Sequence, residues 1–154
     1  MEPDTVPSWY GCAIPEDLLY DIERNVWVRL EGEEAVIGMT DVSQTMCGRF
    51  VAVTWKRVGR EIRRDRGLAI VESAKWVGPV RAPLSGAIVA NNELAFATDI
   101  AIANRDPYGE GWLVRIRPSA LDTELGALVD GASAFEPYRQ FIEENEIHCF
   151  RCED

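Results

Sequence analysis

Short runs of β-branched and aromatic residues recur along most of the chain, and turn-forming residues separate them. Residues 26–31 and 35–39 are two such runs, joined by a Gly-Glu-Glu turn, which is typical of a β-hairpin. Strands this short and this closely spaced are typical of sandwiches and barrels, so we expect a mainly β domain. The further runs occupy residues 50–55, 68–71, 87–90 and 112–116.

Two segments have the pattern of helices instead. Residues 41–47 begin with Asp41, a good N-cap residue, and stop at Gly48, so we expect a short helix there. From Ser119 onward, apolar residues recur at helical spacing on both sides of Gly131. The sequence therefore predicts a β core with C-terminal helices packed on it.

The length of 154 residues fits one domain. We interpret residues 1–17, which are rich in proline, as an irregular N-terminal lead-in, and residues 18–154 as the domain. The N-terminus lacks the basic and apolar regions of an export signal, and no apolar run approaches the ~18 residues of a membrane span. We expect a cytoplasmic monomer, in which the four cysteines are reduced thiols.

The charge balance excludes some partners. The chain has 26 acidic and 16 basic residues and a formal net charge of −10, which opposes binding to nucleic acid or an anionic membrane. Proteins with basic docking faces are the expected partners. Only Lys56 and Lys75 are lysines, and residues 56–66 form a basic strip. This strip is either a docking patch or a solvated hairpin edge.

Lys75 is the residue with the clearest functional signal. An apolar strand at 68–71 runs into a short polar segment that contains Lys75, and an extended segment marked by Pro79 and Pro83 returns. This pattern predicts that Lys75 lies at a hairpin tip. An exposed lysine lacks the burial that would make it a nucleophile, but another enzyme can reach and modify it. An ordinary solvated loop lysine is the alternative.

Several ordered blocks carry a resemblance to a known family. The run Glu72-Ser73-Ala74-Lys75 resembles the lipoyl-attachment signature of the glycine cleavage H-protein family, and residues 82–86, which end at Gly86, continue it at the family's spacing. Residues 37–44, 104–113 and 20–32 are similar to three further blocks of that family. Biotinyl domains share the architecture but typically have Met on both sides of the lysine, so lipoate is favoured.

The resemblance implies a lipoyl carrier with a flattened β-sandwich or hybrid-barrel fold. Lipoate would be amide-linked to Lys75, with Glu72, Ser73, Ala74 and Gly86 as supporting motif residues. The protein would be a substrate of partner enzymes and not itself an enzyme. The implied partners are a lipoate ligase or lipoyl synthase system, dihydrolipoamide dehydrogenase, and the enzymes that load and unload the arm.

The chain departs from the family pattern where cargo is held. Members usually have His-Glu before the first tryptophan and Asp four residues after the lysine, whereas this chain has Asn25-Val26 and Pro79. Those carboxylates lie where an aminomethylated arm is held, and a cationic amine drawn out of water needs such partners. Residues 11–18 and 148–152 resemble the H-like lipoate-binding proteins linked to heterodisulfide-reductase-like sulfur oxidation. We therefore expect a sulfur-bound cargo and a heterodisulfide-reductase-like complex, with aminomethyl cargo and glycine cleavage enzymes as the alternative.

The terminal cysteines suggest a function of another class. Cys149 and Cys152 have the spacing of a redox motif or of half a zinc site, to which His148 and Cys12 could add ligands. Ordinary reduced cysteines or a thiol role beside the lipoyl arm are preferred to a metal site. Cys47 is expected to be buried and inert. An unmodified binding module that has lost the arm is the remaining alternative.

Overall fold

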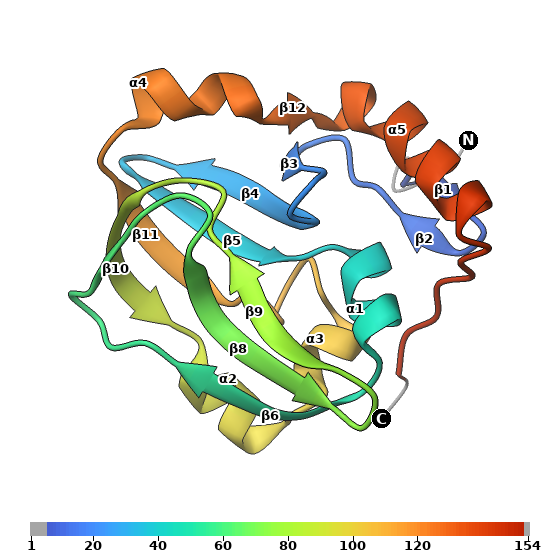
Figure 1. Ribbon diagram of the computed structural model, residues 1–154, viewed down its shortest axis with the longest axis horizontal. Helices are drawn as coiled ribbons and strands as arrows, with labels where there is room; N and C mark the ends of the chain where they lie inside the picture. Colours follow the sequence, from blue (N-terminus) through green and yellow to red (C-terminus); the bar gives the residue numbers. More distant parts are fainter. Residues whose placement is uncertain (1–5, 153–154) are drawn as a thin grey trace.

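The computed structural model describes residues 6–152, whose strands form two main antiparallel sheets and one small hairpin (Figure 1). The hairpin pairs β1 (Ser8–Trp9) with β2 (Cys12–Ala13). The three-stranded sheet has the order β6 (Phe50–Trp55), β8 (Gly67–Ser73) and β9 (Val77–Arg81). The seven-stranded sheet has the order β12 (Val129–Asp130), β3 (Leu19–Asp21), β4 (Val26–Glu31), β5 (Glu34–Met39), β11 (Val114–Pro118), β10 (Gly86–Asn91) and β7 (Glu61–Ile62). The prediction of a mainly β sandwich is confirmed.

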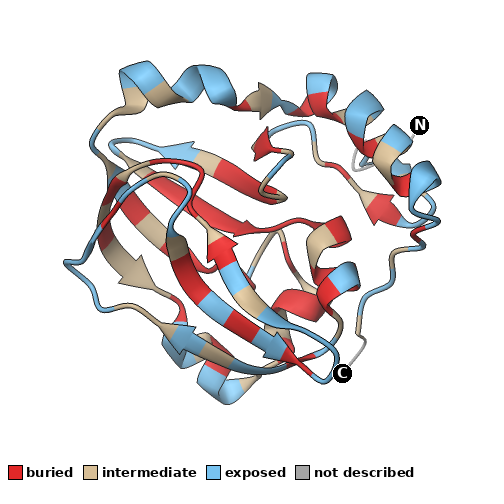
Figure 2. Cartoon of the chain, viewed as in Figure 1, coloured by how far each residue is buried: buried red, intermediate tan, exposed pale blue. Residues whose placement is uncertain are grey.

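The main hydrophobic core lies between the two larger sheets (Figure 2). The seven-stranded sheet contributes side chains such as Val28 and Ile37, and the three-stranded sheet contributes Leu68, Val71 and Val80. Alternate residues of a strand point to opposite faces, so these positions form one apolar face on each sheet. Burial of this area holds the sheet that carries the β8–β9 hairpin against the rest of the protein.

A second core covers the other face of the seven-stranded sheet. Trp27 and Tyr20 point into it, and helix α5 (Gly131–Glu144) packs on them through Tyr138 and Ile142. Strand β4 is therefore buried on both faces, with Val26 and Val28 in the main core and Trp27 in the second. This explains why three consecutive apolar residues occur in a strand of an antiparallel sheet.

Helix α1 (Asp41–Cys47) forms at the predicted residues, with Gly48 at its C-cap in a left-handed conformation (φ 90°). The predicted N-cap is wrong by one residue. Thr40 caps the helix, because its Oγ1 accepts a hydrogen bond from the Ser43 amide at 3.1 Å. The Asp41 carboxylate is buried and instead accepts from the Ala13 amide of the lead-in and pairs with Arg151 of the tail.

The C-terminal helices are also present. They are α4 (Leu121–Glu124), the 3₁₀ turn η1 (Leu125–Ala127) and α5, with the short strand β12 before α5. Sequence patterning missed β12 and two short helices, α2 (Glu93–Thr98) and α3 (Ile102–Arg105). Elements of one or two turns are too short to show a helical period. Among the described residues, no helix combines the length and apolar character needed to cross a membrane.

Two expectations about the N-terminal segment need correction. The described part of the lead-in is not irregular, because it contains the β1–β2 hairpin and buries Cys12 and Ile14 in the second core. The expectation of reduced thiols is wrong for two of the cysteines, since Cys12 and Cys149 form a disulfide. The Cys149 amide donates to the Tyr10 carbonyl at 3.0 Å, which brings the tail to the hairpin. Residues 1–5 of the lead-in lie outside the described residues.

We predict that Gly38→Ala destabilises the protein by about 1–3 kcal/mol, the usual cost of overpacking. Gly38 is paired with Trp27 across β4 and β5, and a Cβ at position 38 would lie 2.5 Å from the Trp27 ring. The ring is buried, and its Nε1 donates to the Pro107 carbonyl at 2.9 Å, so it cannot move aside freely. Urea denaturation measures the loss. Gly126→Ala is the matched control, because a Cβ there meets nothing within 4 Å; equal midpoints for the two variants would contradict this packing.

Candidate functional site

Lys75 lies in the exposed turn between β8 and β9, as predicted. The turn is closed by the Ser73 amide, which donates to the Trp76 carbonyl at 2.8 Å. Beyond it the strands pair from Glu72 and Val77 onward. The lysine is therefore presented at the end of a sheet and not on a loose loop.

Ser73 ties this turn to helix α1. Its side chain is buried, and its Oγ donates to the Cys47 carbonyl at 2.6 Å. The same Oγ accepts from the Lys75 amide at 3.3 Å. Ser73 therefore connects the backbone of the lysine to the last turn of α1, two elements that are distant in the sequence.

Gly48 and Asn104 form the surface beneath the lysine. A Cβ at Gly48 would lie 3.0 Å from Lys75 Cε, so the methylene stem of the lysine lies over this glycine. The Asn104 side chain donates from Nδ2 to the Gly48 carbonyl at 2.9 Å and accepts from the Phe50 amide at 2.9 Å. Asn104 is buried and thereby fixes the bend between α1 and β6.

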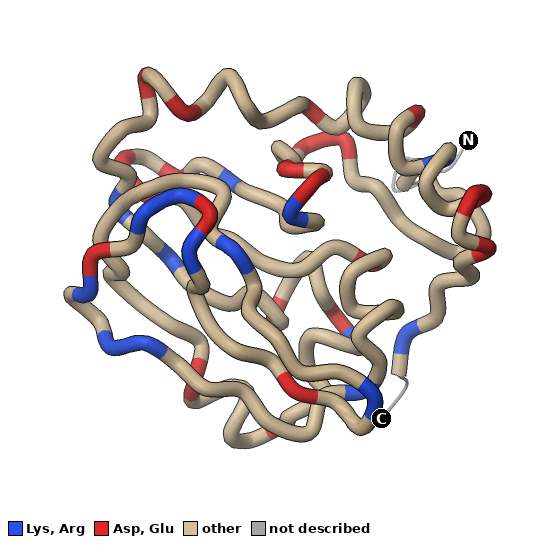
Figure 3. The backbone as a smooth tube through the Cα atoms, viewed as in Figure 1, with Lys and Arg blue, Asp and Glu red and all other residues tan. Residues whose placement is uncertain are grey.

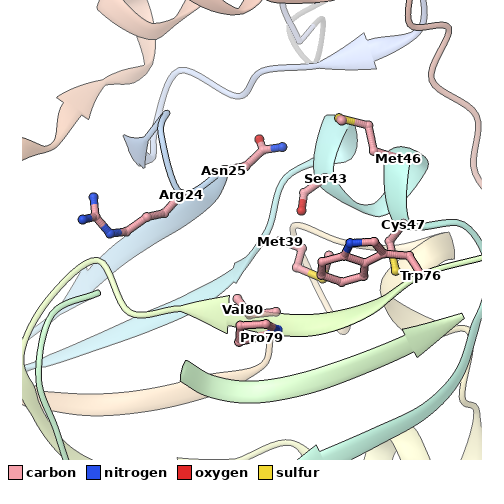
Figure 4. Close-up of a pocket in the computed structure, with 9 residues that line it drawn as sticks. All are labelled: Arg24, Asn25, Met39, Ser43, Met46, Cys47, Trp76, Pro79 and Val80. Carbon is pink, nitrogen blue, oxygen red and sulfur yellow. The ribbon is translucent and has the colours of Figure 1, made fainter. Parts of the chain in front are cut away.

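A cavity of about 260 Å³ lies beside the hairpin tip, between the two sheets and α1 (Figure 4). Figure 4 shows the Trp76 ring along one side, near the sulfur atoms of Met39 and Cys47. The wall of the cavity is largely apolar and includes three sulfur-containing side chains, those of Met39, Met46 and Cys47. The nine lining residues are Arg24, Asn25, Met39, Ser43, Met46, Cys47, Trp76, Pro79 and Val80.

Comparison with known proteins identifies the family. The family model described as glycine cleavage H-protein matches residues 18–144. The chain belongs to the glycine cleavage H-protein family. It is 37% identical over 147 residues to glycine cleavage system H protein 2 of Aquifex aeolicus, covering 95% of this chain and 91% of the relative. It is 40% identical over 144 residues to probable glycine cleavage system H protein 2 of Sulfolobus acidocaldarius, covering 92% of this chain and 95% of the relative.

A solved structure agrees with the observed fold. The crystal structure of a glycine cleavage system H protein from Mycobacterium marinum superimposes with a TM-score of 0.67 at 29% identity. The match covers 87% of this chain and all (100%) of that one. The fold expected from the resemblance to the H-protein family is thus confirmed.

The H-protein motif residues divide into two groups in this structure. Ser73 acts directly at the turn, and Ala74 and Glu72 are exposed beside it. Gly86 lies in β10, where a Cβ would collide with the Arg117 carbonyl of β11. Gly86 therefore permits close pairing of two strands of the larger sheet, and its place in the motif reflects folding.

The two positions at which the chain departs from the H-protein pattern both lie at the cavity. Asn25, in the turn between β3 and β4, and Pro79, in β9, both line it, and Val26 is buried in the adjacent core. Asn25 Oδ1 accepts from Thr40 Oγ1 at 2.7 Å and from the Tyr138 hydroxyl at 2.9 Å. Sequence comparison with the family found these positions, but only the structure shows that they share one wall.

The cavity has no negative charge of its own. None of its nine described lining residues is acidic, and Arg24 is the charged one. The Arg24 guanidinium binds Asp21 at 3.1 Å and Asp65 at 3.0 Å, and Figure 4 shows it extending away from the cavity centre. The polar groups left at the wall are therefore the neutral side chains of Asn25 and Ser43.

The cysteines have distinct environments. Cys47 is buried as predicted, and burial raises the pKa of its thiol, an effect that the nearby Lys75 ammonium partly opposes. Cys149 is bonded to Cys12, so the predicted thiol role does not apply to it in this state. Cys152 is a free, half-buried thiol. Within residues 6–152, no three His, Cys, Asp or Glu side chains are grouped to hold a metal ion.

The basic strip of residues 56–66 lies at the end of the three-stranded sheet opposite the lysine (Figure 3). The register places Trp55 beside Ala69 at that end, whereas Ser73 and the tip are at the other. A docking role for this strip remains a prediction. Such a role would concern a surface remote from Lys75.

We predict that Ser73→Ala lowers stability by about 1–3 kcal/mol, because the buried Cys47 carbonyl loses its donor. The turn also loses its connection to α1, so hydrogen exchange at the Lys75 and Trp76 amides should accelerate more than at the core strands. Urea denaturation and exchange mass spectrometry measure both effects. Ser119→Ala at an exposed position is the control and should be neutral; an equally neutral Ser73→Ala would show that the contact does not hold the turn.

Proposed function

We propose that this chain is a lipoyl carrier of the glycine cleavage H type, with lipoate amide-linked to Lys75. The observation that carries the proposal is the exposed lysine on a turn fixed by Ser73, beside a largely apolar cavity. The family match over residues 18–144 supports the same conclusion. The protein is then a substrate of its partner enzymes, which supply the catalytic groups.

The residues present suit a lipoyl group. Lys75 is exposed to a ligase, and its stem lies over Gly48, where no side chain obstructs it. The indole of Trp76 and the sulfur atoms of Met39 and Met46 provide a soft, apolar surface of the kind that a hydrocarbon chain and a dithiolane prefer. When bound, lipoate supplies a disulfide that can be reduced and can carry a group on sulfur.

The chain's own residues position the root of the lipoyl arm and protect the group that it carries. Ser73 and Asn104 keep the turn and the α1–β6 bend together, which reduces the conformational freedom of the arm's root. The cavity can shield a sulfur-bound group from water while the carrier moves between partners. The proposed partners are a lipoate ligase or lipoyl synthase system, glycine cleavage enzymes and dihydrolipoamide dehydrogenase.

A second candidate concerns the cargo. An aminomethyl group is cationic, and the described wall of the cavity has no acidic residue to pair with it. A sulfur-bound cargo needs no such counter-charge, which favours the heterodisulfide-reductase-like sulfur-oxidation role as the second candidate. The names of the relatives favour the glycine cleavage role.

We predict that co-expression with a lipoate ligase adds one lipoyl mass to the protein and that Lys75→Arg abolishes the addition. A guanidinium does not form the amide, and Arg keeps the charge of the residue. Intact-mass spectrometry measures the modification. Lys56→Arg is the matched control, since Lys56 is the other lysine of the sequence; modification that is lost in this control but kept in Lys75→Arg would overturn the proposal.

We also predict that Pro79→Asp increases the share of lipoylated protein that retains an aminomethyl group. The new carboxylate would lie on the cavity wall and pair with the cationic amine. One partly exposed ion pair contributes about 1 kcal/mol, which changes the ratio of loaded to unloaded protein roughly fivefold. Incorporation of labelled glycine by glycine decarboxylase measures the loaded fraction. Pro79→Asn isolates the charge, and equal loading of the two variants would contradict the prediction.

The same assay separates the two cargoes. Wild-type protein that accepts the aminomethyl group at the rate of an ordinary H-protein supports the glycine cleavage role. Protein that accepts none but is turned over by a heterodisulfide-reductase-like complex with a persulfide donor supports the second candidate.

A further inference from the structure

The C-terminal tail, residues 147–152, runs along α1 to the end of the molecule that carries the lysine (Figure 1). The Phe150 carbonyl accepts from Gln44 Nε2 at 2.9 Å, and Arg151 forms an ion pair with Asp41 at 3.1 Å. The Cys152 amide donates to the Asn104 carbonyl at 3.1 Å. Each of these contacts is made with α1 or α3, the elements that form the surface below Lys75.

The Cys12–Cys149 disulfide fixes the beginning of this tail. It joins the tail to the β1–β2 hairpin, and Cys12 is completely buried in the second core. The tail between Cys149 and Cys152 is therefore held at both ends, by a covalent bond at one and by the Asn104 carbonyl at the other. This arrangement holds the backbone of Cys152 beside α3.

Cys152 is connected to the lysine through only two residues. Its amide binds the Asn104 carbonyl, the Asn104 side chain binds the Gly48 carbonyl at 2.9 Å, and Lys75 Cε lies against Gly48. A lipoyl arm would extend from Lys75 by the length of its acyl chain. This length allows its dithiolane ring to fold back past Gly48 and Asn104 toward Cys152. The other free thiol, Cys47, is buried, and burial raises its pKa, which lowers the fraction of it present as the nucleophilic thiolate.

We propose that Cys152 is a covalent docking site for the lipoyl arm of Lys75, an inference that rests on the proposed function. The Cys152 thiolate attacks one sulfur of the oxidised dithiolane. A disulfide forms between Cys152 and that sulfur, the ring disulfide breaks, and the second lipoyl sulfur leaves as a thiolate and takes up a proton. The step is a thiol–disulfide exchange, so it conserves electrons and needs no external oxidant or reductant.

Attachment to the same chain favours the exchange. The effective concentration of a tethered disulfide near a tethered thiol reaches the millimolar range for short flexible linkers. The exchange retains the arm beside α3 and frees one lipoyl thiol, which a partner enzyme can then use. Attack of that thiol on the mixed disulfide closes the ring again and releases Cys152, so docking is reversible.

The test traps the freed thiol. Lipoylated protein, with the modification verified by intact mass, is treated with iodoacetamide under non-reducing conditions and digested for mass spectrometry. We expect a peptide in which Cys152 is disulfide-bonded to an arm on Lys75 that carries one alkyl group. Cys152→Ser should abolish this species, and a peptide in which the arm is bonded to Cys47 instead would contradict the proposal.

Two further controls address proximity and accessibility. A mixture of Lys75→Arg protein with lipoylated Cys152→Ser protein places the thiol and the arm on separate chains, and it should give no cross-linked peptide. Protein octanoylated at Lys75 has an arm without sulfur, and its Cys152 should be alkylated several-fold faster than Cys152 of the lipoyl form. The Cys12→Ser/Cys149→Ser variant should lower the yield, because its tail is no longer fixed.

The outcomes separate this inference from the proposed function. Absence of a lipoyl mass would refute the function itself. Full lipoylation with an unalkylated arm, and equal alkylation of Cys152 in the lipoyl and octanoyl forms, would refute docking at Cys152 while the carrier function stands. A cross-linked peptide in the mixture of separate chains, at the yield of the intact protein, would also refute it.

Discussion

The surface beneath Lys75 depends on the side-chain amide of Asn104. Gly48 lies in the bend between α1 and β6, and Phe50 begins β6 where the register with β8 is irregular, so the Gly48 carbonyl and the Phe50 amide need other partners. Asn104 supplies both, and its Nδ2 also donates to Gln44 Oε1 at 3.1 Å. A buried backbone group without a partner costs about 1–3 kcal/mol. Asparagine suits this position because its short side chain has both a donor and an acceptor. Aspartate lacks the donor, and leucine lacks both.

This contact has consequences beyond the bend itself. Asn104 holds Gly48, Gly48 supports the stem of Lys75, and Ser73 holds the hairpin to the last carbonyl of α1. The lysine is therefore exposed to solvent while the backbone around it is fixed by buried hydrogen bonds. A carrier needs this combination, since a ligase and its partners must recognise a defined turn and the arm beyond it must move freely.

The features predicted from sequence are those with a local signal. The hairpin of β4 and β5, helix α1 and the turn at Lys75 each depend on alternation, caps or turn residues within a few positions. The Cys12–Cys149 bond spans 137 residues. Asn104 binds the Phe50 amide across a sequence separation of 54 residues. No local pattern encodes such pairings, so the disulfide and the surface below the lysine required the structure.

Asp41 shows how tertiary contacts override a local preference. Asp41 is a good N-cap residue at the start of a helical segment, but Thr40 caps α1 instead. The buried Asp41 carboxylate instead accepts from the Ala13 amide at 2.9 Å and pairs with Arg151 at 3.1 Å. One side chain therefore joins the lead-in, α1 and the tail. A buried carboxylate is retained when it is paired and hydrogen-bonded in this way.

The chain has few lysines, and these contacts give its two lysines different surroundings. Arginine keeps its charge and forms no amide, so only Lys56 and Lys75 offer an amine side chain to a ligase. Lys56 is half-buried at the opposite end of the three-stranded sheet, within the basic strip, and its carbonyl accepts from Asn91 Nδ2 at 3.1 Å. Lys75 is fully presented on a fixed turn. A ligase therefore has only two amine side chains to distinguish, and their backbone surroundings and neighbouring charges differ. Under the proposed function, the shape of the turn that Ser73 and Asn104 maintain would direct a ligase to Lys75.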